Sequence, residues 1–441
     1  MSNLRIIEDL KSFLNQSVNE SSMRQLFTDT PTCFIRDRKL PFDRLALLLI
    51  NLLKKSYSIE IEDFYQLLDE PEMTCSKSAF CQQRMKLKNI FFSCWNSVLV
   101  DSYYRHYEAS VKRWKGFRLM AVDGSTAYLV NKTEIVDYFG TQSNQAASVP
   151  MGRVMTCYDV LNRITVFNEM YPISYAEQYI ANCWLAHYDK DMLMLYDRGY
   201  PSFASIYLHL HQEQEQKFVM RCSNNFNKEV TAFTDSNLYD KTVMFKASEK
   251  GIKELYKHGF IITPHTTVTV RLIKVKLKGG QTEILITNLF DSETYPVKIF
   301  KALYFKRWGI ETNYETHKNK LQLESFTGHK VNTIMQDFYA TFFVGNLQEI
   351  LSKPCKSRIK ETTIGNKYEY KINRNIAIGL MKNKIVKLFT EEYPQTIISQ
   401  LENLFVKYLE PVRPDREYPR VVKRKRAKGK YQTFTNYRRA A

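Results

Sequence analysis

The chain has 441 residues, with 64 Lys and Arg against 46 Asp and Glu, a net charge of +18 and a pI near 9.3. This excess of positive charge favours a polyanionic partner. A hydrophobic content of 44% excludes a purely disordered basic protein, because it is enough to build a packed core. A chain of this length is expected to form roughly two to four domains.

The sequence also indicates the cellular compartment in which the protein is expected. Its most apolar run, Leu45 to Leu53, is too short to span a bilayer, and the N-terminus, with Asp9 and no long apolar stretch, does not read as a signal peptide. The eight cysteines include no C-x2-C pair, so we expect reduced thiols rather than a zinc site. These features predict a cytoplasmic protein without a membrane partner.

Residues 1–110 are predicted to form a helical N-terminal region. Pro41 to Leu53 has the composition of a core helix, since it is apolar on nearly all sides. Ser76 to Lys88 is typical of a capped helix with a basic, Gln-rich face. Such a helix either enters a DNA major groove or lies on the surface as a basic helix, and the sequence favours neither.

Residues 111–222 begin with an alternation of strands and helices. Leu119 to Thr126 and Leu193 to Tyr200 are apolar runs that predict buried strands, each with a carboxylate, Asp123 or Asp197, at its C-terminal tip. Between them, two strand-like runs flank Leu161-Asn162, a hairpin signal, and residues 175–187 predict a helix. Asp159, inside the hairpin, is interpreted as structural.

The remaining segments complete the predicted layout. A helix over 203–211 and a strand over 217–222 precede a β-prone stretch, residues 223–294. The α/β core resumes over 295–350, ending in an apolar helix, and 351–419 is predicted to be helical. The chain ends in a tail, residues 420–441, with nine basic residues and no acid. We expect this tail to bind phosphates without sequence preference, or merely to solubilise the protein.

One motif stands out, the run Leu303 to Lys320 with the spacing Y-x2-R-x3-E-x6-K. On an α-helix at about 100° per residue, its Arg, Glu and Lys fall at roughly −60°, −20° and −40° from its Tyr. The four residues, Tyr304, Arg307, Glu311 and Lys318, therefore share one narrow stripe. A plain solvated face explains such a stripe as well, so the motif gains meaning only beside Asp123 and Asp197.

Three converging carboxylates repel one another unless cations lie between them. Oxygen-only clusters suit Mg²⁺ or Mn²⁺, and two such ions about 4 Å apart clamp the attacking and leaving oxygens of a phosphodiester. We therefore predict that Asp123, Asp197 and Glu311 bind two Mg²⁺ ions, with Mn²⁺ as a substitute. Glu315, near +20° on the same stripe, is a rival ligand by geometry.

The sequence resembles DDE transposases at three places: Asp123 in DGST, Asp197 in YDRGY, and Glu311 in Y-x2-R-x3-E-x6-K. It is most similar to the insertion-sequence-four family of bacterial cut-and-paste elements, from about Phe34 onward. The resemblance implies an α/β, RNase H-like catalytic core over 111–222 and 295–350, with a β-rich insertion over 223–294. It also implies that the N-terminal helices help to bind the element's terminal DNA.

One departure from the family concerns its insertion, where the best-studied relatives place a Trp that stacks on a flipped base. The four Trp of this chain, at positions 95, 114, 184 and 308, all lie outside residues 223–294. A Tyr, Phe or His would have to stack instead. First-strand cleavage is therefore better supported by the sequence than hairpin formation.

The sequence thus predicts a DNA transposase whose Asp123, Asp197 and Glu311 cut the element's ends and transfer the freed 3′-hydroxyl into target DNA. Tyr304, Arg307 and Lys318 would hold phosphates at the cut end. The expected partner is double-stranded DNA, bound by a homodimer near the bacterial nucleoid. An RNase H-type nuclease without strand transfer and an inert, transposase-derived DNA-binding protein are the alternatives. The terminal repeat and the target preference are not encoded in readable form.

Overall fold

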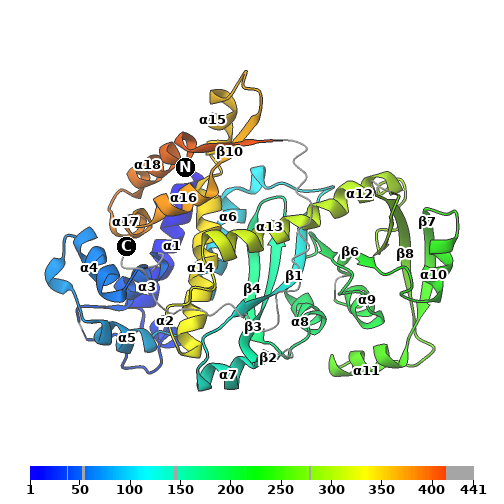
Figure 1. The fold of residues 1–441 in the computed structure, drawn as a ribbon, viewed down its shortest axis with the longest axis horizontal. Helices are drawn as coiled ribbons and strands as arrows, with labels where there is room; N and C mark the ends of the chain where they lie inside the picture. The colour runs from blue at the N-terminus through cyan, green and yellow to red at the C-terminus, as the bar shows by residue number, and fades with distance from the viewer. Residues whose placement is uncertain (37, 52–54, 144–147, 214, 278–279, 414–441) are drawn as a thin grey trace. The chain divides into compact units, whose positions relative to one another are not determined.

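The computed structural model describes residues 1–36, 38–51, 55–143, 148–213, 215–277 and 280–413, so the predicted tail lies outside the described residues. The chain forms two compact units (Figure 1). The helical unit contains residues 1–110, 127–152 and the described part from 315 onward. The sheet unit contains residues 111–126 and 153–314. None of the helices in the described ranges is long and apolar enough to cross a membrane.

The helical unit is built around two long helices that pack together, α6 (Ile90–His106) and α14 (Val331–Leu351). Trp95 of α6 stacks on Phe343 of α14 with ring centroids 4.5 Å apart, and both side chains are buried. The apolar helix predicted at the end of the α/β core is α14, which is mostly buried but packs on α6 within the helical unit. Further N-terminal helices are α1 (Ser2–Asn19), α2 (Ser21–Phe27), α3 (Phe42–Ile50), α4 (Tyr57–Leu67) and α5 (Lys77–Met85).

The other elements of this unit are shorter. After α14 come α15 (Cys355–Thr362), α16 (Arg374–Met381), α17 (Lys384–Thr390) and α18 (Pro394–Lys407). β10 (Glu369–Ile372) pairs with β11 (Leu409–Val412) in an antiparallel ribbon. α7 (Thr133–Phe139) and β2 (Thr141–Ser143) come from the segment that joins two strands of the main sheet. The predicted helical character of 1–110 and 351–413 therefore holds, apart from this small ribbon.

The helix α5 begins as predicted but uses its polar side chains differently. Ser76 caps it by accepting a hydrogen bond from the Ala79 amide. Arg84 is buried, however, and donates to Gln336 and to Asp337 at 2.6 Å. Gln83 is also buried and donates to a backbone carbonyl. These two side chains therefore hold the helical unit together, so the proposal that they read bases in a major groove is wrong.

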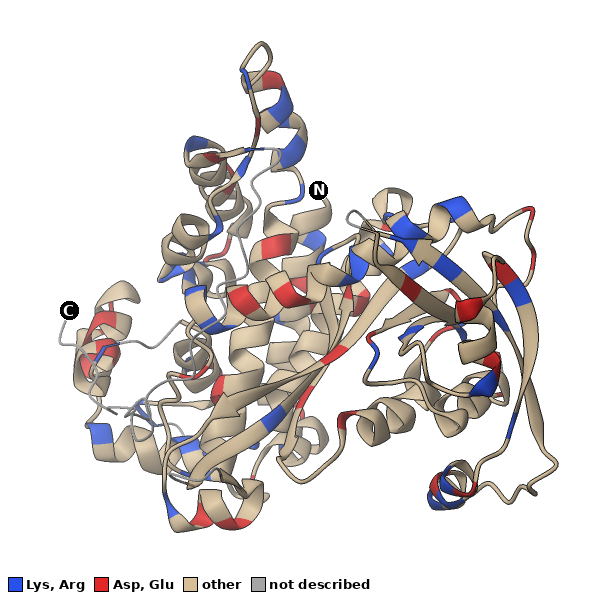
Figure 2. Ribbon diagram, turned by 45° about the vertical axis from the view of Figure 1, so that its right-hand side comes forward, with Lys and Arg blue, Asp and Glu red and all other residues tan. Residues whose placement is uncertain are grey.

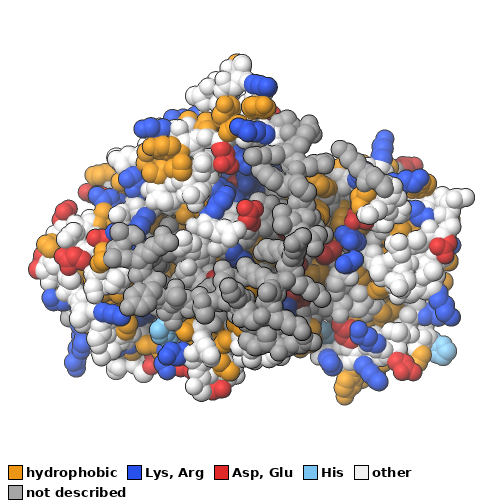
Figure 3. All heavy atoms as spheres, viewed as in Figure 1, with side chains coloured by type: hydrophobic (Ala, Val, Ile, Leu, Met, Phe, Trp, Pro, Cys, Tyr) orange, Lys and Arg blue, Asp and Glu red, His pale blue; other side chains and the backbone are white. Residues whose placement is uncertain are grey.

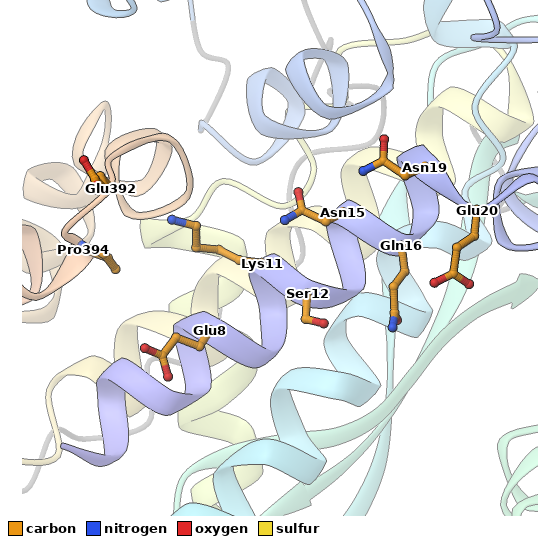
Figure 4. Close-up of a pocket in the computed structure, with 9 residues that line it drawn as sticks. All are labelled: Glu8, Lys11, Ser12, Asn15, Gln16, Asn19, Glu20, Glu392 and Pro394. Carbon is orange, nitrogen blue, oxygen red and sulfur yellow. The ribbon is translucent and has the colours of Figure 1, made fainter.

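The helical unit also has a surface cavity of about 480 Å³ beside α1, which Figure 4 shows in close-up. Its lining includes three carboxylates, Glu8, Glu20 and Glu392, but a single cation, Lys11. The Lys11 ammonium already donates to the Glu391 carbonyl. This cavity is therefore acidic on balance and unsuited to a polyanion.

The main sheet has the strand order β2-β3-β1-β5-β6-β9-β8-β7, and β4 pairs with β3. β1, β5 and β6 are parallel neighbours. The order β4-β3-β1-β5-β6, with β3 and β4 joined by a tight turn, is the arrangement of an RNase H-like core, which confirms the predicted α/β fold class. The core strands are β1 (Arg118–Tyr128), β3 (Ser148–Asp159), β4 (Ile164–Pro172), β5 (Met192–Tyr196) and β6 (Lys217–Cys222).

The segment predicted as a β-rich insertion continues this sheet instead of forming a separate layer. In its described residues β9 pairs antiparallel with β6, β8 with β9 and β7 with β8. These elements are α10 (Lys228–Asp235), β7 (Asp240–Lys246), α11 (Glu249–Lys257), β8 (Thr267–Lys276) and β9 (Thr282–Thr287). The sheet unit also contains α8 (Glu177–Cys183), α9 (Phe203–Leu210), α12 (Val297–Phe305) and α13 (Gly309–Glu315).

The turn between β3 and β4 confirms the structural role expected of Asp159. Its buried carboxylate accepts hydrogen bonds from the backbone amides of Leu161 and Asn162 and from the Asn162 side chain. All of these contacts lie within the turn. Asp159 therefore stabilises the hairpin on which the order of the core strands depends.

A buried histidine ties α9 to the end of β5, directly before Asp197. Nδ1 of His209 lies 2.6 Å from the Ser205 carbonyl, and Nε2 lies 3.1 Å from the Tyr196 hydroxyl. Burial lowers the pKa of His209 to about 4. The folded state therefore holds this imidazole neutral at pH values where the unfolded chain, with an ordinary pKa of 6.5, takes up a proton.

We expect acidification to destabilise the protein through His209. Its contribution is fully present above pH 6.5 and is lost as the pH falls toward 4, by about 2 kcal/mol between pH 6.5 and pH 5. Urea unfolding at these two pH values should show this loss in the wild type and a correspondingly smaller loss in His209→Gln. Equal losses in the two proteins would contradict the assignment.

Candidate active site

The two predicted aspartates lie at the same level of neighbouring parallel strands. The register pairs Arg118 with Met192 and runs on to Val122 with Tyr196, so the next positions are Asp123 and Asp197. Adjacent strands are about 4.8 Å apart, so the two carboxylates start from neighbouring backbone positions. One detail of the prediction is wrong, since Asp123 is not at a strand tip: β1 continues to Tyr128. What ends directly before Asp123 is the pairing of β1 with β5, whose last partners are Val122 and Tyr196.

Asp123 is held in surroundings that oppose its ionisation. Burial is the main cause that raises its pKa to about 7, and the charges of Glu177 and Asp197 add to it. The nearby Arg307 and a hydrogen bond from the Gly124 amide act in the opposite direction. A buried carboxylate among other carboxylates is the electrostatic setting in which a cation binds well.

The predicted stripe is only partly helical in the regular sense. α12 ends at Phe305, a 3₁₀ turn spans Lys306–Trp308, and α13 covers Gly309–Glu315. A π-helical turn, Thr316–Lys320, follows. The assumption of one uninterrupted α-helix is therefore wrong. Arg307 nevertheless contacts both Tyr304 and Glu311, across two changes of helix type.

Arg307 is the centre of these contacts. Its buried guanidinium lies 5.8 Å from the centre of the Tyr304 ring, and Nη2 donates to Oε1 of Glu311 at 3.0 Å. Nη1 lies 3.9 Å from Oδ2 of Asp123. Among the described residues, Nε and Nη1 have no hydrogen-bond partner. Unmet donors on a buried cation cost free energy, so they mark a place where an anionic ligand binds favourably.

Tyr304 supports the second aspartate. Its buried hydroxyl is 3.2 Å from the Tyr196 carbonyl and 3.5 Å from Oδ1 of Asp197. Burial raises the pKa of this phenol, so the hydroxyl keeps its proton as a hydrogen-bond donor. Tyr304 is therefore placed to orient the backbone and the carboxylate at the end of β5, a more indirect role than phosphate binding.

Glu311 does not complete a three-carboxylate cluster. Within the described ranges, no three His, Cys, Asp or Glu side chains are close enough together to hold a metal ion. Its carboxylate is instead paired with Arg307 and is 44% exposed. Two of the three predicted ligands, Asp123 and Asp197, are therefore neighbours, whereas the third, Glu311, is paired with the Arg307 guanidinium. The donors are all carboxylate oxygens, which fit a hard divalent cation such as Mg²⁺.

The last residue of the motif, Lys318, lies in the π-helical turn. It belongs to the helical unit, whereas the aspartates, Tyr304, Arg307 and Glu311 belong to the sheet unit. Its ammonium lies 3.8 Å from Glu324, and burial lowers its pKa. Glu315, the rival ligand, is an exposed residue at the end of α13. The predicted phosphate-binding role of Lys318 stays a prediction.

Two further residues position the site, and the sequence did not single them out. The Tyr314 hydroxyl donates to the backbone carbonyl of Asp123 at 2.8 Å, which ties α13 to β1. Arg221 follows Met220 on β6, and Met220 is the register partner of Tyr196. Arg221 is therefore level with Asp197. Its guanidinium is 3.9 Å from Asp197 and 2.9 Å from Glu283 of β9. A lone Arg in the apolar run 217–222 was the available signal, but only the strand register gives it meaning.

A fourth carboxylate, Glu177, lies directly against the strand that carries Asp123. A Cβ placed on Gly124 would be 2.2 Å from Cδ of Glu177. The Glu177 carboxylate is held there by Arg153 and lies 3.4 Å from the Tyr200 hydroxyl. A methyl group at position 124 would therefore displace the end of the Glu177 side chain. No local signal in the sequence connects Gly124 to residue 177.

One comparison with known proteins finds a family match. Residues 174–347 match the family of transposase DDE domains. The matched segment contains Asp197 and the whole Y-x2-R-x3-E-x6-K motif, whereas Asp123 precedes it. This match supports a transposase of the DDE type, and the narrower insertion-sequence-four assignment stays a prediction.

A comparison with curated proteins gives no match. Among solved structures, the chain is similar to one described as a cryo-EM structure of the piggyBac transposase synaptic complex with hairpin DNA. The sequence identity is 10% and the TM-score 0.41, and the match covers 92% of this chain and 84% of that one.

We expect Gly124→Ala to destabilise the protein by about 1–3 kcal/mol, because the new methyl group must push the Glu177 carboxylate away from Arg153. Glu177→Ala in the same chain should remove most of this penalty, which a double-mutant cycle of urea unfolding will measure. Gly199→Ala is the matched control, since nothing lies within 4 Å of a Cβ at that position. Additive penalties in the double mutant would show that Glu177 is not the obstacle.

Proposed function

We propose that the protein is a DNA transposase of the DDE type, which cuts the ends of its element and joins the freed 3′-hydroxyl to target DNA. The observation that carries this proposal is the strand register that puts Asp123 beside Asp197, together with a buried Arg307 that faces them with unmet donors. The match of residues 174–347 to transposase DDE domains supports the same reaction class.

Three carboxylates are the donor chemistry that divalent cations prefer, and two of them, Asp123 and Asp197, occupy neighbouring strand positions in this state. Asp123, Asp197 and Glu311 would hold Mg²⁺ or Mn²⁺, which would supply an activated water or hydroxyl and stabilise the leaving oxygen. For Glu311 to serve as a ligand, its carboxylate must leave Arg307. The same exchange frees the Nη2 donor of Arg307, so that the guanidinium can grip a phosphate with its planar fork.

The remaining side chains hold the reacting groups in place. Tyr304 steadies the end of β5 through the Tyr196 carbonyl, and Tyr314 fixes α13 to the backbone of Asp123. Arg221 keeps a positive charge beside Asp197 and is a second candidate for phosphate contact. Positioning of this kind supplies much of the rate in phosphoryl transfer, because the protein itself forms no covalent bond.

The wider DNA contacts are also part of the proposal. Lys and Arg are spread over the ribbons of both units instead of being confined to one element (Figure 2). Nine further positive charges are in the tail after residue 419. Double-stranded element ends and target DNA, bound by a homodimer in the cytoplasm of a bacterium, are the partners and setting that we propose. Lys318 is proposed to contact phosphate as well.

We expect Asp123→Asn, Asp197→Asn and Glu311→Gln each to abolish Mg²⁺-dependent strand cleavage while DNA binding persists. Loss of one ligand misplaces a cation and the oxygen it holds, which costs several orders of magnitude in rate. The measurement is nicking and strand transfer on a plasmid that carries the element with its natural flanks. Mobility shifts measure binding on the same DNA.

Glu315→Gln is the matched control for Glu311→Gln, because it removes a carboxylate four residues away on the same segment. It should leave cleavage unchanged. Cleavage that survives Glu311→Gln but not Glu315→Gln would transfer the role to Glu315. Cleavage without any strand-transfer product in the wild type would favour the RNase H-type nuclease instead.

Arg307→Ala should weaken binding to DNA that ends at the cut site and slow cleavage, while Mg²⁺ binding persists. The reason is that Arg307 is a buried cation with free donors but cannot ligate a metal. Arg307→Lys should restore only part of the activity, because an ammonium lacks the bidentate fork. Isothermal titration with Mg²⁺ separates metal binding from DNA binding, and a normal cleavage rate in Arg307→Ala would disprove phosphate holding.

A further inference from the structure

The sheet unit has a second feature suited to nucleic acid, a groove of about 980 Å³ between α8 and α11. Both helices pack on α9, and Gly251 of α11 is in close contact with Phe203 there. We call this feature the α8–α11 groove. Its lining residues are Ser174, Tyr175, Ala176, Gln178 and Tyr179 on one side and Glu249, Lys250, Lys253, Glu254 and Lys257 on the other.

One wall of the α8–α11 groove is a row of lysines. Lys250, Lys253 and Lys257 recur every three or four residues on α11, which places them on one face of the helix. All three are exposed, and no described carboxylate forms an ion pair with them within 4.0 Å. The groove also contains Glu249 and Glu254, so cations exceed acids by one. In Figure 3, Lys and Arg side chains gather where α11 lies in Figure 1.

The opposite wall offers aromatic rings. Tyr175 is 45% exposed, and Tyr179 is half-buried beside His258, with ring centroids 5.0 Å apart. A ring supported on one side and open on the other is a platform for a nucleobase. A basic row facing aromatic rings is the combination that binds single strands, because the cations follow the phosphates while the bases stack. Paired bases in a duplex have no free faces for such stacking.

The groove starts beside the candidate active site. Its residues 174–176 directly precede Glu177, whose carboxylate lies against Gly124, the neighbour of Asp123. Gln178, which lines the groove, donates to the Tyr200 carbonyl, and the Tyr200 hydroxyl is near Glu177. These contacts fix the N-terminus of α8 at the site. One wall of the groove is therefore attached, through Glu177 and Gln178 of α8, to residues next to Asp123.

We propose that the α8–α11 groove binds a single-stranded segment of DNA that continues from the phosphate at the aspartates. The direction of the strand rests on the proposed function, whereas the groove's preference for single strands does not. In this arrangement Lys250, Lys253 and Lys257 contact consecutive stretches of the backbone, and Tyr175 and Tyr179 stack on bases. The groove would hold DNA that becomes unpaired at the cut.

The test uses the full-length protein with two fluorescent probes, a thymidine oligonucleotide and a mixed-sequence duplex of equal length. The groove variant is Lys250→Gln/Lys253→Gln/Lys257→Gln. The charge-matched control, Lys228→Gln/Lys241→Gln/Lys246→Gln, removes three exposed lysines from the same insertion but outside the groove. We expect the groove variant to bind the oligonucleotide roughly tenfold more weakly, with a salt slope about two units smaller. The control should lose little, and equally for both probes.

The aromatic wall of the groove is tested with a second pair of variants, one inside the groove and one outside it. Tyr179→Ala should weaken oligonucleotide binding and spare the duplex, whereas Tyr256→Ala, a 72% exposed ring on α11 outside the groove, should change neither. With 5-iodouracil in the oligonucleotide, photocrosslinks should map to Tyr175 or Tyr179. No oligonucleotide binding by the wild type, equal losses in the two lysine variants, or crosslinks confined to other elements would overturn the proposal.

Failure of the groove and failure of the proposed function give different results. Normal cleavage of element DNA together with unchanged oligonucleotide binding in the groove variant would refute the groove alone. Groove-dependent oligonucleotide binding in a protein that never cleaves DNA would refute the transposase proposal and leave the groove assigned. Circular dichroism and thermal unfolding of each variant confirm that it is folded.

Discussion

Repulsion between two neighbouring carboxylates is the constraint on which the sheet unit depends. The register that aligns Val122 with Tyr196 leaves Asp123 and Asp197 side by side at the point where their strands stop pairing. Burial and the nearby acids raise the pKa of Asp123 to about 7. Two positive charges offset this repulsion. Arg307 from the 3₁₀ turn lies near Asp123, and Arg221 from β6 lies near Asp197.

This constraint explains why the surrounding elements are tied so closely to two strands. α13 must stay near β1 to keep Arg307 and Glu311 in place, and the Tyr314 hydroxyl secures it on the Asp123 carbonyl. The end of β5 is held by Tyr304 from α12 and, through Tyr196, by His209 from α9. Hydrogen bonds from buried side chains to these strand ends are therefore concentrated where the charges meet.

The sequence was sufficient where the signal is local. Apolar runs that lead to Asp123 and Asp197 and the hairpin at 161–162 predicted the core strands and the neighbouring positions of the two aspartates. It failed where helix type changes, because the 3₁₀ and π turns around α13 follow from packing and not from propensity. Glu177 and Arg221 were missed for a related reason. Their roles come from strand register and from contacts across the sheet unit, which no single run of residues encodes.

The pairing of Glu311 with Arg307 has a thermodynamic consequence for the proposed function. In this state Glu311 does not join the two aspartates in a metal-binding cluster of the described residues, and one donor of Arg307 is occupied by Glu311. A cation that draws Glu311 away releases an Arg307 donor, and a phosphate that engages Arg307 releases Glu311. Under the proposed function, binding of the cation and of the phosphate would be coupled through this one ion pair, and each would favour the other by the same free energy. A metal site that is completed only when DNA is present would restrict hydrolysis to the bound substrate.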